Sequence, residues 1–78
     1  MGRFLLEPAE SQEHSHDFAV NVMLVTGSGE ICVNGVKKVL NRGESIFVEK
    51  NVSHKVTNLS AEQCIVNCEG TLKNERQL

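Results

Sequence analysis

The sequence contains no tryptophan and no tyrosine, and it has no excess of basic residues. Without these two aromatic residues, no ring with a polar tip is available to shape or clamp an aromatic substrate. The eight Lys and Arg residues are outnumbered by ten Asp and Glu residues and are scattered along the chain. The electrostatic footprint of a nucleic-acid-binding protein is therefore missing, and we exclude nucleic acid as a partner.

Long apolar runs are also missing. No segment approaches the roughly 18 apolar residues that a membrane span needs. The opening residues, "MGRFLLEPAES", contain neither the apolar core of a signal peptide nor a small-residue cleavage site. We therefore expect a cytoplasmic protein without a membrane partner.

The three cysteines are an odd number in a chain without an export signal, so a disulfide framework is not expected and the thiols should be reduced. Cys64, Val66 and Cys68 share one face of an expected strand. The thiols of Cys64 and Cys68 could therefore supply metal ligands. We prefer the simpler interpretation that they are small buried hydrophobic side chains in the last strand of a barrel.

A chain of 78 residues forms one domain, residues 1–78, near the lower size limit for a self-sufficient core. A partner surface often supplies the missing burial at this size, which favours a homodimer. Residues 1–12 should form an N-terminal strand and its lead-in, and residues 71–78, "TLKNERQL", a polar tail.

The pattern along the chain is that of strands. The segments "FAVNVMLV" and "EICVNGVKKVL" are rich in β-branched residues, and Asn34-Gly35 between apolar stretches is a strong hairpin signal. No segment is typical of a long helix. We expect strands at residues 4–6, 14–26 with a bend near Asp17, 29–33, 36–40, 45–48, 54–57 and 63–68. Many short strands separated by turns predict an all-β sandwich or barrel.

In "AVNVMLV", alternation places Asn21 and Met23 on one face and Val20, Val22 and Leu24 on the other. One face should line the interior of a barrel. We expect the face with Val20 to need a cover from a second subunit, which again favours a homodimer. The alternative cover is the chain's own N-terminal segment, "RFLL".

Two of the three histidines stand one residue apart, in "SQEHSHD". In a strand, residues i and i+2 project from one face about 7 Å apart, so His14 and His16 can point two imidazoles at one ion. His54, in "NVSHKVTN", is the only other histidine. Alone, such a pair could simply be solvated, and a single histidine is usually a surface or core residue.

The surrounding sequence resembles the cupin superfamily. The first cupin motif has an HxH pair, then a glutamate, then a glycine, and here His14, His16 and Gly27 match it. Asn21 takes the place of the glutamate.

The second cupin motif is matched by Gly43, His54 and Asn58, while Glu49 and Asn51 replace its proline and glycine. Asn tolerates a left-handed turn conformation, so Asn51 can replace glycine. The resemblance implies a small antiparallel double-stranded β-helix, or jelly-roll barrel, with the histidines inside its mouth.

The resemblance also implies a metal site formed by His14, His16 and His54, without the usual acidic ligand. Three imidazoles suit one divalent transition metal, and Fe, Zn, Ni and Mn are not distinguished. Without a carboxylate the ion keeps its full charge, which favours an anionic small molecule in the open positions. We expect Asn21, Met23 and Asn58 near the metal or the substrate; the alternative for Asn21 is a buried amide satisfied by backbone groups.

Two functions remain open from the sequence. Some cupins with three histidines and no acidic ligand are dioxygenases, so the first hypothesis is a mononuclear metal oxygenase. The second is a non-catalytic cupin that binds or senses a small molecule, with or without metal. Asp17 and Glu13 flank the histidine pair but should point to the opposite face, which leaves no obvious general base.

Overall fold

The structure is a computed structural model that describes residues 2–70. Within this part of the chain, eight strands and no helix are present. The strands are β1 Gly2–Leu6, β2 Ser11–His14, β3 Val20–Leu24, β4 Ser28–Val33, β5 Val36–Asn41, β6 Ser45–Val48, β7 His54–Asn58 and β8 Cys64–Gly70. No helix that could span a membrane is found in residues 2–70. The predicted polar tail, residues 71–78, lies outside the described residues.

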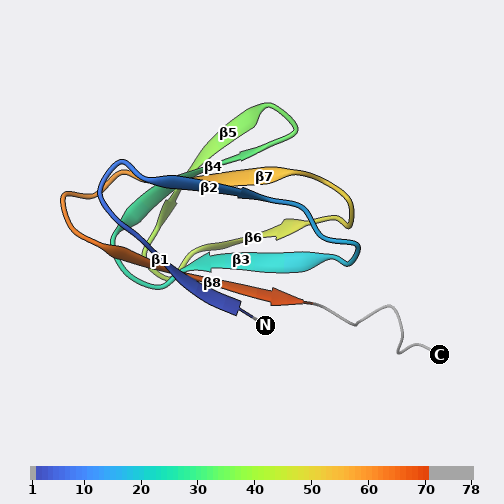
Figure 1. The fold of residues 1–78 in the computed structure, drawn as a ribbon, viewed down its shortest axis with the longest axis horizontal. Helices are drawn as coiled ribbons and strands as arrows, with labels where there is room; N and C mark the ends of the chain where they lie inside the picture. Colours follow the sequence, from blue (N-terminus) through green and yellow to red (C-terminus); the bar gives the residue numbers. More distant parts are fainter. Residues whose placement is uncertain (1, 71–78) are drawn as a thin grey trace.

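The strands form two four-stranded antiparallel sheets that face each other (Figure 1). The first sheet has the order β1-β8-β3-β6 and the second the order β2-β7-β4-β5. Successive strands often change sheet, as β1, β2 and β3 do, so the chain winds around a common interior. The predicted all-β jelly-roll barrel, the double-stranded β-helix, is confirmed.

The turns follow from the residues that occupy them. Asn34 and Gly35 have φ angles of 53° and 77° and connect β4 to β5, with Val33 paired to Val36. Two consecutive positive φ angles are what a two-residue hairpin needs, and Asn and Gly adopt them at low cost. Asn51 has a φ of 63°, which confirms that it replaces glycine in a left-handed turn.

The core lies between the sheets. Alternation along each strand turns every second side chain inward, and the inward set is almost entirely apolar. The buried apolar residues are Leu6, Val20, Val22, Leu24, Ile31, Leu40, Val48, Val56, Cys64 and Val66.

The predicted strand 14–26 is wrong as a single element. It is divided between β2 in one sheet and β3 in the other, with a bend at Asp17 and Phe18. The apolar run after Phe18 is continuous in sequence, but the chain crosses from one sheet to the other before Val20. Composition alone does not mark that crossing.

The face of β3 that was expected to need a cover is already buried inside the barrel. Val20, Val22 and Leu24 are each 1% exposed and form part of the barrel's own core, so they need no cover from a second subunit or from the N-terminal strand. The homodimer stays a prediction, and a sedimentation mass near the chain mass of 8.6 kDa would contradict it.

The barrel has two ends that differ in their connections (Figure 1). The β2–β3 and β6–β7 loops lie at one end, and the β1–β2, β3–β4 and β7–β8 loops lie at the other. We call the first the histidine end, because it carries His14, His16 and His54, and the second the asparagine end, because it carries Asn58.

Candidate functional site

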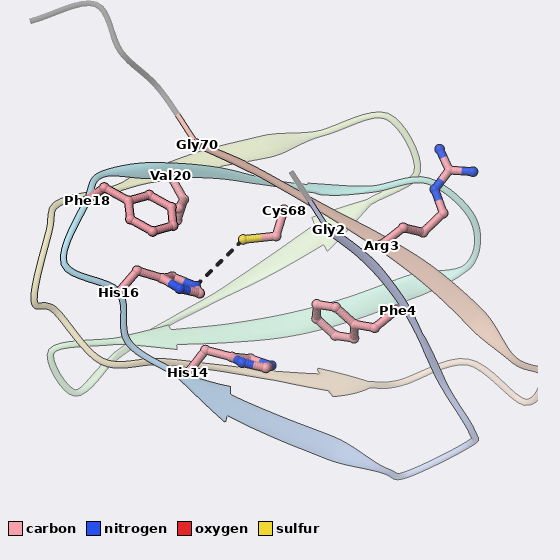
Figure 2. A pocket seen from close by; sticks show the side chains of 9 residues that line it. All are labelled: Gly2, Arg3, Phe4, His14, His16, Phe18, Val20, Cys68 and Gly70. Carbon is pink, nitrogen blue, oxygen red and sulfur yellow. Dashed lines mark hydrogen bonds between the residues drawn. The ribbon is translucent and has the colours of Figure 1, made fainter. Parts of the chain in front are cut away.

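A pocket of about 310 Å³ opens at the histidine end. Its polar lining comes from two imidazoles and a thiol, and its apolar walls come from two phenyl rings and a valine (Figure 2). The lining residues are Gly2, Arg3, Phe4, His14, His16, Phe18, Val20, Cys68 and Gly70. The side chain of Arg3 points away from the histidines (Figure 2).

Strand pairing brings the three histidines together. His14 ends β2 and lies directly opposite His54, which begins β7. His16 follows in the β2–β3 connection, and its carbonyl accepts a hydrogen bond from the Asn51 N–H at 2.6 Å. The left-handed turn at Asn51 thus ties the β6–β7 loop to the segment that carries His16.

The imidazole rings lie within a short distance of one another. The ring centroids of His14 and His16 are 6.0 Å apart with nearly parallel planes, and that of His54 lies 6.1 Å from His14 and 5.4 Å from His16. Phe4 packs against His14 and Phe18 against His16, at 5.3 and 5.1 Å between centroids. These phenyl rings restrict the imidazoles to the pocket wall.

Hydrogen bonds decide which ring nitrogens are available. The Nδ1–H of His54 donates to the Val52 carbonyl at 3.3 Å, because a carbonyl can only accept. Its Nε2 is then the unprotonated nitrogen, and it has no hydrogen-bond partner within residues 2–70. The Nε2–H of His14 donates to Oε1 of Gln12 at 3.0 Å, which leaves the lone pair on Nδ1.

His54 is held in its neutral form. Its side chain is only 2% exposed, and this burial lowers its pKa below the ordinary value of 6.5. The hydrogen bond to Val52 acts in the opposite direction, and the charges of His16 and His14 lower the pKa further. A neutral imidazole with a free lone pair is the form that binds a metal ion.

Cys68 completes the polar lining of the pocket. Its Sγ lies 3.9 Å from Nε2 of His16 (Figure 2). Donor atoms of His16, His54 and Cys68 all lie within 4.8 Å of one another. Burial raises the pKa of the Cys68 thiol, so a thiol that binds no metal is protonated at neutral pH.

These donors fit a divalent transition metal in kind and in position. Imidazole suits Zn, Cu, Fe and Ni, and thiolate adds preference for softer ions. The side chains come from the β2–β3 connection, β7 and β8, so a bound ion would join segments from both sheets. The donor atoms converge from separate segments of the chain, unlike those of a solvated surface pair.

The expected positions of Asn21 and Met23 are wrong. Asn21 is exposed and Met23 does not line the pocket, because both point to the outer face of β3. Val20 is the β3 side chain that lines the pocket. Alternation explains the inversion, since the residues that face inward on β3 are the even-numbered ones.

The expected position of Asn58 is also wrong. It is 1% exposed and lies at the asparagine end, four residues along β7 from His54. Its Nδ2 donates to the carbonyls of Leu6 and Glu62 at 2.9 and 2.8 Å, and its Oδ1 accepts from the N–H of Ser60 at 2.8 Å and from the Ser60 hydroxyl. Asn58 is a structural amide.

The sequence analysis did not place Phe4 or Phe18 at the pocket, and it preferred a structural role for Cys68, which also lines the pocket. Side chains at every second position share one face of an extended chain, so alternation from His14 to Val20 is a signal that would have placed Phe18 on the pocket side. For Phe4 and Cys68 the position depends on pairing between distant strands, with Phe4 opposite Val66 and Cys68 opposite Val22. Local sequence carries no signal for that register.

Solved structures share this arrangement of strands. The Drosophila melanogaster CENP-C structure, determined bound to CAL1, has a TM-score of 0.82 at 12% identity over 88% of this chain and 62% of that chain. A de novo designed double-stranded β-helix has a TM-score of 0.80 at 21% identity, over 90% of this chain and 96% of the design.

A Cupin 2 conserved barrel domain protein from Salinispora arenicola has a TM-score of 0.75 at 22% identity, over 85% of this chain and 56% of that chain. This chain thus spans about three fifths of the two natural proteins. At these identities the likeness shows the fold, and one fold serves unrelated functions.

A search of curated proteins gives no match. The family model described as the Cupin domain matches residues 2–68, nearly the whole of the described chain. This match agrees with the facing antiparallel sheets and with the histidines at one end of the barrel. The chain therefore belongs to the cupin domain family.

Proposed function

We propose that this protein binds one divalent transition metal through His14, His16 and His54 and receives a small anionic molecule in the adjoining pocket. The observation that carries the proposal is the state of His54. Its imidazole is buried, its Nδ1–H is held by a backbone carbonyl, and its ring centroid lies 6.1 Å from that of His14 and 5.4 Å from that of His16. A hydrogen bond from the second ring nitrogen to a backbone carbonyl fixes the orientation of a histidine that ligates a metal.

The cost of burying His54 supports the same proposal. A buried polar atom without a partner usually costs about 1–3 kcal/mol. The Nε2 atom of His54 has no hydrogen-bond partner within residues 2–70, although the rest of its ring is constrained. A metal ion would satisfy this atom and offset that cost.

The pocket supports a small ligand with an acidic group. Its walls at Phe4, Phe18 and Val20 are apolar, and its volume of about 310 Å³ suits a small molecule. The three histidines are neutral ligands and leave the ion with positive charge, which favours an anionic donor such as a carboxylate, thiolate or enolate. An ion bound here would polarise such a ligand or exchange electrons with it.

Two activities are compatible with this pocket, a metal-dependent dioxygenase and a non-catalytic binding protein. One observation favours the second: among residues 2–70, the pocket lining contains no carboxylate that could serve as a general base. Glu13, beside the histidines in sequence, is exposed and accepts a hydrogen bond from the Ser53 hydroxyl at 2.8 Å. A dioxygenase would have to work without such a group.

Metal analysis tests the proposal. The protein is purified without added metal, reconstituted separately with Zn²⁺, Fe²⁺, Ni²⁺ and Mn²⁺, desalted, and analysed for bound metal. We expect close to one equivalent for at least one ion, and its loss in His16→Ala and His54→Ala. Asp17→Ala, which removes an exposed carboxylate beside the histidines, should keep the metal.

Less than about a tenth of an equivalent for every ion would refute metal binding. Oxygen uptake by the Fe²⁺-loaded protein, measured with small thiols and diketones, separates the two activities. Uptake that disappears in His54→Ala supports a dioxygenase. Ligand binding without uptake supports the non-catalytic protein.

A further inference from the structure

Cys68 lies where a ligand to the same ion would lie. It is near the end of β8, where register places it opposite Val22 on one side and Gly2 on the other. Its thiol points into the pocket toward His16 (Figure 2). Sγ of Cys68 and Nε2 of His16 lie 3.9 Å apart, although the two residues are 52 positions apart in sequence.

We infer that the Cys68 thiolate is a metal ligand in addition to the histidines, beside His16 and His54, so that the centre contains sulfur as well as nitrogen. This inference rests on the proposed function, because it concerns the same ion. It adds a ligand that the family resemblance does not supply, and it limits which metals the site prefers.

The distances support direct coordination. A tetrahedral ion with about 2.0–2.1 Å to nitrogen and about 2.3 Å to sulfur holds neighbouring ligand atoms about 3.5 Å apart. Sγ of Cys68 and Nε2 of His16 are already at 3.9 Å, and the donor atoms of all three residues lie within 4.8 Å. Small side-chain rotations would close the remaining gap without a change in strand register.

The charge of the site supports the same assignment. Val20 is the residue that β3 presents to the pocket, and it offers no donor. Without a carboxylate, the imidazoles provide no negative charge to the ion. A thiolate at Cys68 reduces the net charge of the centre from +2 to +1, which strengthens the binding of the cation.

A sulfur ligand selects the metal. Thiolate ligands favour softer ions, whereas Mn²⁺ prefers oxygen. We therefore expect Zn²⁺ and Co²⁺ to bind at least about tenfold more tightly than Mn²⁺, which also stands lowest in the general affinity order. This narrows the choice of metals that the histidines alone leave open.

The two other cysteines differ from Cys68. Cys64 is 0% exposed and belongs to the apolar core at the opposite end of β8. Cys32 is partly exposed on β4, where it lies opposite Lys37 and Lys55. Only Cys68 has its sulfur beside a histidine nitrogen among residues 2–70. Cys32→Ser therefore provides a control that removes a thiol without touching the pocket.

Titration with Co²⁺ tests the inference, under a phosphine reductant that does not compete as a thiol. Cobalt bound to thiolate gives an intense sulfur-to-metal charge-transfer band in the near ultraviolet, which cobalt bound only to imidazole lacks. We expect this band to saturate at one equivalent in the unmodified protein and in Cys32→Ser. Cys68→Ser should lose the band and bind Co²⁺ at least about tenfold more weakly, since even outer-shell changes cost 10–100-fold.

The outcomes separate the two claims. Stoichiometric Co²⁺ binding without the band in the unmodified protein overturns the role of Cys68 and leaves the histidine site intact. A band that persists in Cys68→Ser likewise overturns it. Absence of Co²⁺ binding in the unmodified protein overturns both the inference and the proposed function. The charge-transfer band of the unmodified protein is measured without any variant, so a folding defect in Cys68→Ser cannot obscure that result.

Discussion

The two ends of the barrel are built from the same pair of strands but treat polar groups in opposite ways. At the asparagine end, β7 finishes with Asn58 and β8 begins with Cys64. At the histidine end, β7 begins with His54 and β8 carries Cys68. Each end thus pairs one buried polar side chain with one cysteine.

The difference lies in hydrogen-bond satisfaction. Asn58 uses both its amide hydrogens and its oxygen in bonds to Leu6, Ser60 and Glu62. His54 forms a hydrogen bond only through Nδ1. The side chains around it, His16 and Cys68, contribute nitrogen and sulfur atoms that could ligate a metal. We conclude that the asparagine end closes the barrel and the histidine end keeps donor atoms available for a ligand.

The largest effect on stability should come from the asparagine end. Asn58→Ala removes the side-chain partner of the Leu6 carbonyl and of the Ser60 N–H, whereas the Glu62 carbonyl keeps the Ser60 hydroxyl at 3.2 Å. Because a buried unsatisfied group costs about 1–3 kcal/mol, we expect a loss of about 3 kcal/mol in the free energy of unfolding, measured by urea denaturation. Metal bound per folded chain should not change. Lost metal with unchanged stability would reverse the roles of the two ends.

A second test at the asparagine end concerns backbone shape. Gly27 has a φ of 82°, and a Cβ there would lie 2.7 Å from Oγ of Ser60 and 3.0 Å from Cβ of Cys64. Gly27→Ala should cost about 2 kcal/mol, from left-handed strain and from these contacts. Gly35→Ala is the control, because its φ is 77° but nothing lies within 4 Å, so it should cost about 1 kcal/mol. Equal losses would show that the space beside Gly27 is unimportant.

The histidine end should make stability depend on pH. Burial lowers the pKa of His54 in the folded protein, so between that pKa and 6.5 the unfolded chain binds more protons. The contribution of the neutral His54 to the stability of the metal-free protein is therefore fully present above pH 6.5 and is lost as the pH falls toward the folded-state pKa. Urea denaturation from pH 8 to pH 5 measures this slope. It should be smaller in His54→Gln, and an unchanged slope would remove His54 as its cause.

The smallest effect is expected on the outer face of β3. Asn21 is exposed and does not line the pocket, so Asn21→Glu should change the free energy of unfolding by less than about 0.5 kcal/mol and leave metal affinity unchanged. Val20→Glu should instead lower the stability of the metal-free protein and increase the stabilisation by added metal, since it places a carboxylate in the pocket. Thermal unfolding with and without Zn²⁺ measures both. Stronger metal binding in Asn21→Glu would show that Asn21, and not Val20, faces the metal.

Local sequence predicted an all-β sandwich or barrel, and the family resemblance predicted the jelly-roll arrangement. Asn34 and Gly35 form the predicted hairpin because two consecutive positive φ angles admit few other residues. The convergence of His14, His16 and His54 was predicted from the spacing of the first two and from the family resemblance of the third. These features depend on neighbouring residues or on motifs that span most of the chain.

The errors have physical causes. The motif spacing placed Asn21 at the metal, whereas simple alternation from His14 and His16 reaches Val20. Cys68 and Asn58 make their contacts with residues 52 positions away, so their roles depend on pairing between distant strands. Patterns of period two show which face a residue occupies but not which partner lies opposite.

The most direct test of this account is an NMR titration of the histidine and asparagine side chains with Zn²⁺. We predict that the imidazole nitrogen resonances of His14, His16 and His54 change and saturate at one equivalent, with Nε2 of His54 as the coordinating atom. The Asn58 side-chain amide at the other end should not change. Imidazole resonances that remain unaltered at one equivalent of Zn²⁺ would contradict the account.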